Sequence, residues 1–596
     1  MTPRQLTPRR SPARTVPGLL LATARRAPDR IFIRFLDPER SEAPPREITF
    51  HGFLSGVARA AAALAGAGLG PGSRLLLAAD NSPEWQMLAL GAQVLRAEPA
   101  AVFASLGAGA AREAALRVGP RVVFASGAAQ WEKLAPAGEA LKAAGLSLVV
   151  TPQQLPVGAL PSGVRGLSLA EACGEGARAL PQAELEARAT AVGEEDPYLL
   201  LFTSGTTGRP KGVRLPQRAI VHAIEGGEAA TGSDEADRGL HFLPFAHVAG
   251  HDQFVLALAE GHELVMFARR EDLPRALSLG PTYLFSVPLV YERVRLEVEA
   301  RLARLPGPLR AAARGLLEGA VRARVDGSRR AGDRARAALA GALLGRAVRR
   351  RLGGRVRGLF SGGAPASPAL FRFFEGLGIP FVELYGMSET AGLVSSNAFG
   401  GPRRAGCAGL ITADHELRLA PDGELLLRGP LLFSGYLDEA DNREAFTADG
   451  FFRTGDVGRV DEEGLIRVEG RKKALLVLST GKKLCPEPIE VAIAGTPPFQ
   501  GAVLLGEGRP FVSAVVFVAR EEVDRLRAGG LDPAEALLPR ARAALGAFSE
   551  YEKPKRLVVL RGGPQEHPDL LTPTLKLRRE ALLEFIGSRL SELYAA

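Results

Sequence analysis

The residues from Thr203 to Gly212 of this 596-residue sequence combine glycines, hydroxyls and a lysine, a set that could bind phosphate groups. They read TSGTTGRPKG and directly follow the apolar run YLLLF at 198–202. The glycines leave backbone N–H groups free to donate, the hydroxyls donate further hydrogen bonds, and Lys211 adds positive charge. The pattern predicts a loop that cradles phosphates, although it does not fit the GxxxxGK[ST] spacing of a Walker A loop. The residues predicted to contact phosphate are Thr203, Ser204, Gly205, Thr206, Thr207, Gly208 and Lys211.

Short apolar runs, which must position this loop, alternate with Ala/Leu/Arg-rich helical stretches along most of the chain. RLLLAA at 74, RVVFAS at 121 and ELVMF at 263 are typical of buried strands. The alternation predicts an α/β fold with parallel-rich sheets sandwiched by helices. Because 596 residues are too many for one core, we expect two or more domains.

Two stretches interrupt the alternation. Residues 290–357 are rich in Arg, Ala and Leu and are broken near Pro306 and Gly327, which predicts an insertion of two or three amphipathic helices. The insertion is either a solvated surface or a site of peripheral contact with an anionic membrane; its lack of interleaved aromatic residues argues against nucleic acid. After Arg471 the pattern becomes that of a smaller α+β unit. We predict an N-terminal domain over 1–469 and a C-terminal domain over 470–596.

Composition narrows the function only slightly. The net charge of +9 permits contact with nucleotides, CoA or acidic lipid alike. Cys173, Cys407 and Cys485 are sparse and widely separated, which argues against a disulfide framework and favours a reducing cytoplasm. His247 and His251 lie four residues apart without the glutamate of an HExxH motif, so we expect no zinc site.

The N-terminal segment contains arginines before the apolar run VPGLLLA at 16–22. This run is shorter than an export signal needs, so we expect a frayed arm that leads into a first helix. No stretch of 18 uncharged apolar residues occurs, and a membrane span is therefore not expected. We predict a cytoplasmic protein.

TSGTTGRPKG closely resembles the phosphate loop of the adenylate-forming (AMP-binding) superfamily, which contains acyl-CoA synthetases, nonribosomal peptide adenylation domains and luciferases. Downstream, ELYGMSET at 383–390 resembles the YGxTE segment of that family. The resemblance implies that Tyr385 stacks on adenine and that Ser388 or Thr390 meets the α-phosphate. It also implies that Glu389 binds Mg²⁺, which suits a reaction between a carboxylate and an anionic phosphate. The nucleotide-binding residues implied here are Tyr385, Gly386, Met387, Ser388 and Thr390.

Two other segments resemble nucleotide-binding motifs of the same family. SGGAP at 361–365 resembles the loop that lines the adenine pocket, where missing side chains let a flat base approach the backbone. FFRTGD at 451–456 resembles the FxTGD segment, whose aspartate, Asp456, would accept hydrogen bonds from the ribose hydroxyls. The adenine-pocket residues implied are Gly362, Gly363, Ala364 and Pro365.

GRKK at 470–473 resembles the hinge motif of the family. By this resemblance Arg471 contacts ribose or phosphate, and Lys473 is the pivot about which a mobile C-terminal domain turns. TGKKL at 480–484 resembles the glycine loop, with Gly481, beside which the pantetheine of CoA enters.

LTPTLKLRR at 571–579 resembles the C-terminal lysine motif. Lys576 would bridge the carboxylate and α-phosphate oxygens during adenylation, a role that suits a flexible point charge on a mobile domain. This form of the motif favours the long-chain fatty acyl-CoA synthetase branch. So do YLFSVPLVYER at 283–293 and LPFAHV at 243–248, the segment of His247, near which family members place the acyl tunnel.

The resemblance predicts a ligase that uses ATP, Mg²⁺ and CoA. A fatty acid first becomes an acyl-adenylate with release of pyrophosphate, and the CoA thiol then displaces AMP. No covalent enzyme intermediate is implied, so Cys485 need not be a nucleophile. A fatty acyl-AMP ligase that loads a carrier protein, a nonribosomal peptide adenylation domain and a non-catalytic nucleotide- or lipid-binding protein are the alternatives. Intact Lys576, Glu389 and Lys211 argue against the last of these. Acyl chain length and the choice between monomer and homodimer stay open.

Overall fold

The apolar runs form two large sheets in the computed structural model, which describes residues 5–6, 10–40, 42–203, 210–401, 403–412, 414–546, 548–572 and 577–594. The first sheet has eight strands, and neighbours from β9 to β8 are parallel while β10 and β20 are antiparallel. Its order is β20 (Gly435–Tyr436), β10 (Lys211–Pro216), β9 (Pro197–Thr203), β5 (Glu98–Ala101), β4 (Arg74–Ala78), β6 (Val122–Ala125), β7 (Leu148–Thr151) and β8 (Arg165–Ser168).

The second sheet has ten strands, and its central strands from β15 to β2 are parallel. Its order is β1 (Gln5–Leu6), β17 (Leu410–Thr412), β16 (Ser395–Ser396), β15 (Phe381–Tyr385), β14 (Gly358–Ser361), β13 (Tyr283–Ser286), β11 (Arg238–His241), β12 (Glu263–Phe267), β2 (Ile31–Leu36) and β3 (Arg46–Thr49). The predicted α/β fold with parallel-rich sheets is confirmed.

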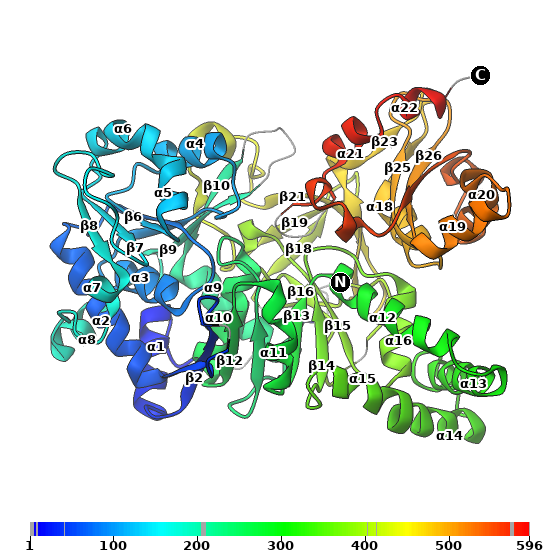
Figure 1. Cartoon of the computed structure of the whole chain (residues 1–596), viewed down its shortest axis with the longest axis horizontal. Coiled ribbons are helices and arrows are strands. Elements are labelled where there is room, and N and C mark those ends of the chain that lie inside the picture. The colour runs from blue at the N-terminus through cyan, green and yellow to red at the C-terminus, as the bar shows by residue number, and fades with distance from the viewer. Residues whose placement is uncertain are drawn as a thin grey trace.

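Helices between the two sheets join them into one hydrophobic core (Figure 1). Phe32 of β2 stacks on Phe50 with ring centroids 4.5 Å apart and lies 5.2 Å from the ring of Phe254. Trp85 is fully buried in the same core. These contacts hold the two large sheets at a fixed spacing. The helices are α1 (Val16–Arg26), α2 (Phe50–Gly66), α3 (Pro83–Val94), α9 (Gln217–Thr231) and α10 (Val248–Glu260).

A four-stranded antiparallel sheet leads from the large sheets to a smaller C-terminal unit. It consists of β18 (Glu416–Leu419), β19 (Glu424–Arg428), β21 (Phe452–Val460) and β22 (Ile466–Arg471). The C-terminal unit has its own cores around the sheet of β25 (Phe499–Leu505), β26 (Ser513–Val518) and β27 (Leu557–Arg561). Its helices are α18 (Pro486–Ala494), α19 (Arg520–Ala528), α20 (Pro533–Ala543), α21 (Arg579–Ile586) and α22 (Arg589–Glu592). The prediction of a smaller C-terminal α+β part is confirmed.

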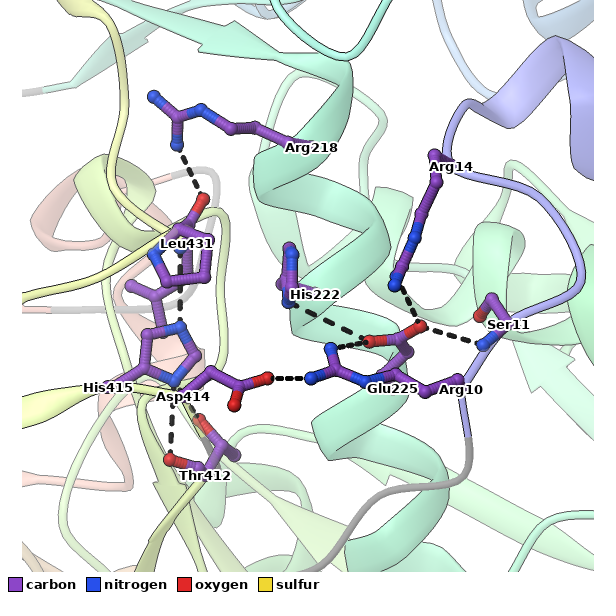
Figure 2. Close-up of polar contacts among 11 residues, drawn as sticks. Arg10, Ser11, Arg14, Arg218, His222, Glu225, Thr412, Asp414, His415 and Leu431 are labelled. Atoms are coloured by element: carbon purple, nitrogen blue, oxygen red, sulfur yellow. Dashed lines mark hydrogen bonds and ion pairs between the residues drawn. The ribbon is translucent and has the colours of Figure 1, made fainter.

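The N-terminal arm is held against the second sheet, so the prediction of a frayed arm is wrong for its described residues. Figure 2 shows Arg10, Ser11 and Arg14 converging on the carboxylate of Glu225 in α9. The Ser11 N–H donates to Glu225 Oε1 over 2.7 Å, and the two guanidiniums lie 3.2 and 3.0 Å from its oxygens. Because the Glu225 side chain is almost completely buried, partners from the arm compensate its lost hydration.

The arginine-rich stretch at 290–357 forms α12 (Pro288–Ala303), α13 (Gly307–Arg324), α14 (Ala331–Ala340) and α15 (Arg346–Arg351), with a π-helical segment at Gly341–Gly345 between the last two. Helices α13 and α14 pack on each other at the edge of the molecule (Figure 1). Leu309, Leu339 and Leu343 are more than half exposed on these segments. No helix of the described chain is long and apolar enough to cross a membrane.

Candidate active site

A cavity of about 2250 Å³ is lined by both large sheets, by the four-stranded sheet and by the C-terminal unit. This volume exceeds the roughly 300–1,000 Å³ of a typical single-ligand site. Thr203 of β9, Tyr385 of β15, Glu424 of β19 and Thr572 all border it. The cavity therefore lies where four parts of the chain meet and has room for more than one substrate.

The predicted phosphate loop connects two antiparallel strands at the edge of this cavity. Its two described ends, Thr203 and Pro210, line the cavity, as does Lys211 at the start of β10. The strands β9 and β10 pair Thr203 with Lys211, which closes the loop between them. The predicted contacts Ser204, Gly205, Thr206, Thr207 and Gly208 lie outside the described residues.

The segment after β15 makes a tight turn that brings polar side chains to the cavity. A Cβ on Gly386 would stand 1.3 Å from the Gly392 carbonyl oxygen, so only glycine fits there. Ser388 and Glu389 border the cavity. Thr390, by contrast, is fully buried, and its hydroxyl bonds the backbone of Met387. Of the two residues predicted to meet the α-phosphate, the geometry favours Ser388.

Glu389 and Lys211 are held by a common aromatic neighbour, Tyr436 of β20. The Tyr436 hydroxyl donates to Glu389 Oε1 over 2.9 Å, and the Lys211 ammonium lies 4.6 Å from the centre of the Tyr436 ring. Lys211 also forms an ion pair of 3.0 Å with Asp441. Burial and the nearby Glu389 carboxylate raise the pKa of Tyr436, so its hydroxyl remains a donor. The arrangement orients one carboxylate and one ammonium at the same cavity wall.

Asp456 is clamped between two residues that themselves line the cavity. The Tyr385 hydroxyl donates to Asp456 Oδ2 over 2.7 Å, and Arg471 Nε lies 2.7 Å from Oδ1. Asp456 is only 3% exposed and lies directly behind the cavity wall. Burial, followed by the charge of Asp456, raises the pKa of Tyr385 well above its ordinary value.

The remaining predicted residues divide between the cavity wall and positions outside it. Gly362, Gly363, Gly386, Met387, His247 and Lys473 line the cavity, whereas Ala364, Pro365 and Gly481 do not. His247 caps α10 by accepting a hydrogen bond of 3.2 Å from Ala249 N–H. Gly481 lies in the turn between β23 (Leu476–Val477) and β24 (Lys483–Leu484), with a φ of 81° that favours glycine.

Lys576 lies outside the described residues. Leu571 and Leu577, on either side of that gap, form an antiparallel bridge. Thr572 and Gln565 from the same part of the chain border the cavity. The C-terminal unit thus contributes directly to the cavity wall.

Away from the polar motifs, the cavity wall becomes largely apolar. Helices α9, α10 and α12 and the ends of the central strands contribute to this surface, which suits a hydrocarbon chain. Its members include Ala223, Ile224, Leu240, Phe242, Val248, Leu256, Phe267, Leu277, Leu289 and Val294.

The sequence motifs did not point to three polar residues of the wall: Tyr436, Asp441 and Glu424. Glu424 accepts a hydrogen bond of 3.1 Å from the Gly455 N–H and forms an ion pair of 3.1 Å with Lys472. Tyr436, Asp441 and Glu424 each lie on a short element whose local sequence carries no motif. Only their place in the sheets brings them to the cavity, so no local signal could have found them.

Comparisons with known proteins agree with this arrangement. Residues 20–437 match the family model "AMP-binding enzyme", and residues 473–584 match "AMP-binding enzyme C-terminal domain". The long-chain-fatty-acid–CoA ligase FadD15 of Mycobacterium bovis is 35% identical over 449 residues, which cover 70% of this chain and 73% of that protein.

Two solved structures share the fold. The adenylation domain of a carboxylate reductase from Mycobacterium chelonae superposes with a TM-score of 0.74 at 21% identity, covering 99% of this chain and 94% of that one. ATP-bound MatB from Rhodopseudomonas palustris gives a TM-score of 0.68 at 20% identity, with 96% and 99% coverage. With the family models and FadD15, these likenesses lead to one conclusion: the chain belongs to the AMP-binding, adenylate-forming enzyme family, in its fatty acyl-CoA ligase branch.

Proposed function

We propose that this protein activates a long-chain fatty acid with ATP and transfers the acyl group to CoA, yielding acyl-CoA, AMP and pyrophosphate. One observation carries the proposal. A single cavity joins the polar wall of Lys211, Ser388 and Glu389 to an apolar extension along α9 and α10. Such a cavity can hold a nucleotide and a hydrocarbon chain with their reactive ends in contact. The likeness to FadD15 supports the choice of fatty acid and CoA.

In the first step, the fatty carboxylate attacks the α-phosphorus of ATP, and pyrophosphate leaves. Thr203 and Lys211 would hold the phosphates, Ser388 the α-phosphate, and Asp456 and Arg471 the ribose. Lys576 would place its positive charge between the attacking carboxylate and the α-phosphate oxygens. A positive charge placed where negative charge develops in the transition state can raise the reaction rate by about two to three orders of magnitude.

Mg²⁺ suits the donor set around Glu389. Proteins usually bind this ion through one or two carboxylates together with substrate phosphates. Glu389 borders the cavity, and the Tyr436 hydroxyl at 2.9 Å fixes its orientation. Mg²⁺ held there would neutralise phosphate charge.

In the second step, the C-terminal domain, proposed to span 470–596, would turn about Lys473 and withdraw Lys576. The CoA thiol then attacks the acyl carbonyl. A bond forms between the CoA sulfur and the acyl carbon, the bond from that carbon to the AMP oxygen breaks, and AMP and the thiol proton are released. Burial raises the pKa of Cys485 to about 11, so its thiol stays protonated at neutral pH. This supports direct transfer to CoA without an acyl-cysteine intermediate.

We further propose that α13–α15 contact an anionic membrane surface. Arg329, Arg330 and Arg334 are exposed there, and Leu339 and Leu343 are 51% and 60% exposed. Basic and apolar side chains together are what a peripheral membrane site needs.

The two half-reactions of a Lys576→Ala variant test the proposed chemistry. Acyl-adenylate formation from ATP and fatty acid should fall by about two orders of magnitude or more, because the charge at the reacting oxygens is lost. Conversion of supplied acyl-AMP and CoA to acyl-CoA should stay within about threefold of wild type, since that step takes place after Lys576 has left. Equal loss of both half-reactions, or of neither, would contradict the role given to Lys576.

A further inference from the structure

The cavity-facing sides of α9 and α10 are mostly apolar or small, and Asp252 is the one ionisable side chain on them. On α10, positions 248, 249, 252, 253 and 256 line the cavity, a spacing that defines one helix face. On α9, positions 223, 224, 227 and 231 do the same. Asp252 therefore lies within a largely apolar wall that suits a hydrocarbon.

The Asp252 carboxyl group has no hydrogen-bond partner among the described residues. Its Oδ1 is fully enclosed and unpaired. Its Oδ2 packs against Gly392, where an added Cβ would stand 1.9 Å from this oxygen. Leaving a buried polar atom without a partner costs stability that a leucine at this position would not cost.

The other polar side chains on these two faces are already satisfied. Gln253 donates to the Leu240 carbonyl over 2.9 Å and contacts His241 Nδ1 at 3.0 Å. The Thr231 hydroxyl donates to the Gly227 carbonyl over 2.8 Å. Asp252 is thus the side chain on these faces whose hydrogen-bonding capacity is left for a ligand.

The α9 side of the cavity also has open space. A Cβ on Gly227, on the facing helix α9, would meet no atom within 4 Å. The contact with Gly392 sets Asp252 close to the 386–392 turn, which carries Ser388 and Glu389. A group on the acyl chain at this depth lies in its carboxyl-proximal half.

The protonation of the Asp252 carboxyl indicates which polar group on the acyl chain could bind to it. Burial raises the pKa of Asp252 well above its ordinary value and so favours the neutral carboxyl over the carboxylate. A neutral carboxyl offers one O–H donor and one carbonyl acceptor. A hydroxyl, which also donates and accepts, is a substituent that suits such a group.

We propose that Asp252 is a specificity-determining residue and that the preferred substrate is a fatty acid with a hydroxyl group in its carboxyl-proximal half. The inference rests on the proposed function, because it concerns the acid that the same cavity activates. A site built to bond a substrate hydroxyl strongly rejects the analogue without it, since the protein group is then left unpaired.

The test compares hexadecanoic acid with its 2-, 3-, 6- and 16-hydroxy derivatives by kcat/KM for ATP-dependent pyrophosphate release. Wild type should favour one proximal isomer over the plain acid by about tenfold or more, and the 16-hydroxy acid should gain nothing. Asp252→Leu should remove this preference, and Asp252→Asn should keep it within about threefold, because an amide also donates and accepts. Asp449→Leu, which removes an exposed carboxylate paired with Arg418 outside the cavity, is the control and should leave the ratio unchanged.

Thermal unfolding separates specificity from a structural role. Asp252→Leu should fold with unchanged or higher Tm, because it removes an unpaired buried carboxyl. Activation of plain and hydroxylated acids at a ratio that Asp252→Leu does not change would overturn the inference and leave the proposed function intact. If no acid of either kind is activated, the proposed function fails, and this inference fails with it.

Discussion

At the scale of single residues, the Asp456 carboxylate is positioned by Tyr385 and Arg471, each 2.7 Å away. Asp456→Ala should raise the KM for ATP about 10- to 100-fold, because a hydrogen bond to a charged group is worth about 1.5–3 kcal/mol. Pyrophosphate release at varied ATP is the measurement. Asp449→Ala removes an exposed carboxylate paired with Arg418 and is the matched control. An unchanged KM for ATP in Asp456→Ala would reject the ribose assignment.

His415 makes the stability of this region sensitive to acid. Its Nε2 accepts a hydrogen bond of 3.3 Å from the Leu431 N–H, and Nδ1 lies 3.0 Å from the Thr412 hydroxyl (Figure 2). Burial lowers the pKa of His415 to about 4, whereas an unfolded histidine titrates near 6.5. The neutral ring's contribution is therefore fully present above about pH 6.5 and is lost as the pH falls toward about 4.

The His415→Gln variant isolates this contribution. The difference in unfolding free energy between wild type and variant should shrink by about 2 kcal/mol between pH 7 and pH 5. Urea unfolding at the two pH values measures it. Removal of the exposed His51 controls for the loss of an imidazole as such. A difference that does not change with pH would show that the folded ring titrates normally.

At the scale of elements, α13–α15 carry the proposed membrane contact. Charge reversal of Arg329 and Arg330 should weaken binding to phosphatidylglycerol vesicles by about tenfold or more, because each basic residue near such a surface contributes about 1 kcal/mol. Leu339→Ser with Leu343→Ser should weaken it further. Cosedimentation with these vesicles, and with phosphatidylcholine vesicles as the uncharged control, measures the effect. Equal binding of all variants would place the membrane contact elsewhere or exclude it.

The same scale explains which parts of the site the sequence could predict. Thr203 and Lys211 belong to a contiguous motif whose glycines and hydroxyls indicate phosphate binding, whereas Glu389 was predicted from the resemblance of its segment to a family motif. The structure brings all three to one cavity. Tyr436 and Glu424 come from short strands that pair only after the sheets assemble, so no local pattern marks them. Ser388 and Thr390 look equivalent in sequence, and only the turn in the backbone separates a cavity position from a buried one.

At the scale of the whole molecule, hydrophobic alternation was enough to predict an α/β fold with parallel-rich sheets, because buried parallel strands need continuous apolar runs. The attachment of the N-terminal arm was not predictable. Its arginines face a buried glutamate, Glu225, more than 200 positions away. Such long-range ion pairs depend on sheet order, which local sequence does not encode.

The central claim is that one cavity activates a fatty acid with ATP and passes it to CoA. The most direct test is pyrophosphate release from ATP across a chain-length series of fatty acids, with and without CoA. Without CoA, release should require a fatty acid and stop near one equivalent per protein; with CoA it should turn over and yield acyl-CoA and AMP in equal amounts, fastest for long chains. Release that ignores fatty acid, or turnover that requires a carrier protein in place of free CoA, would contradict the account.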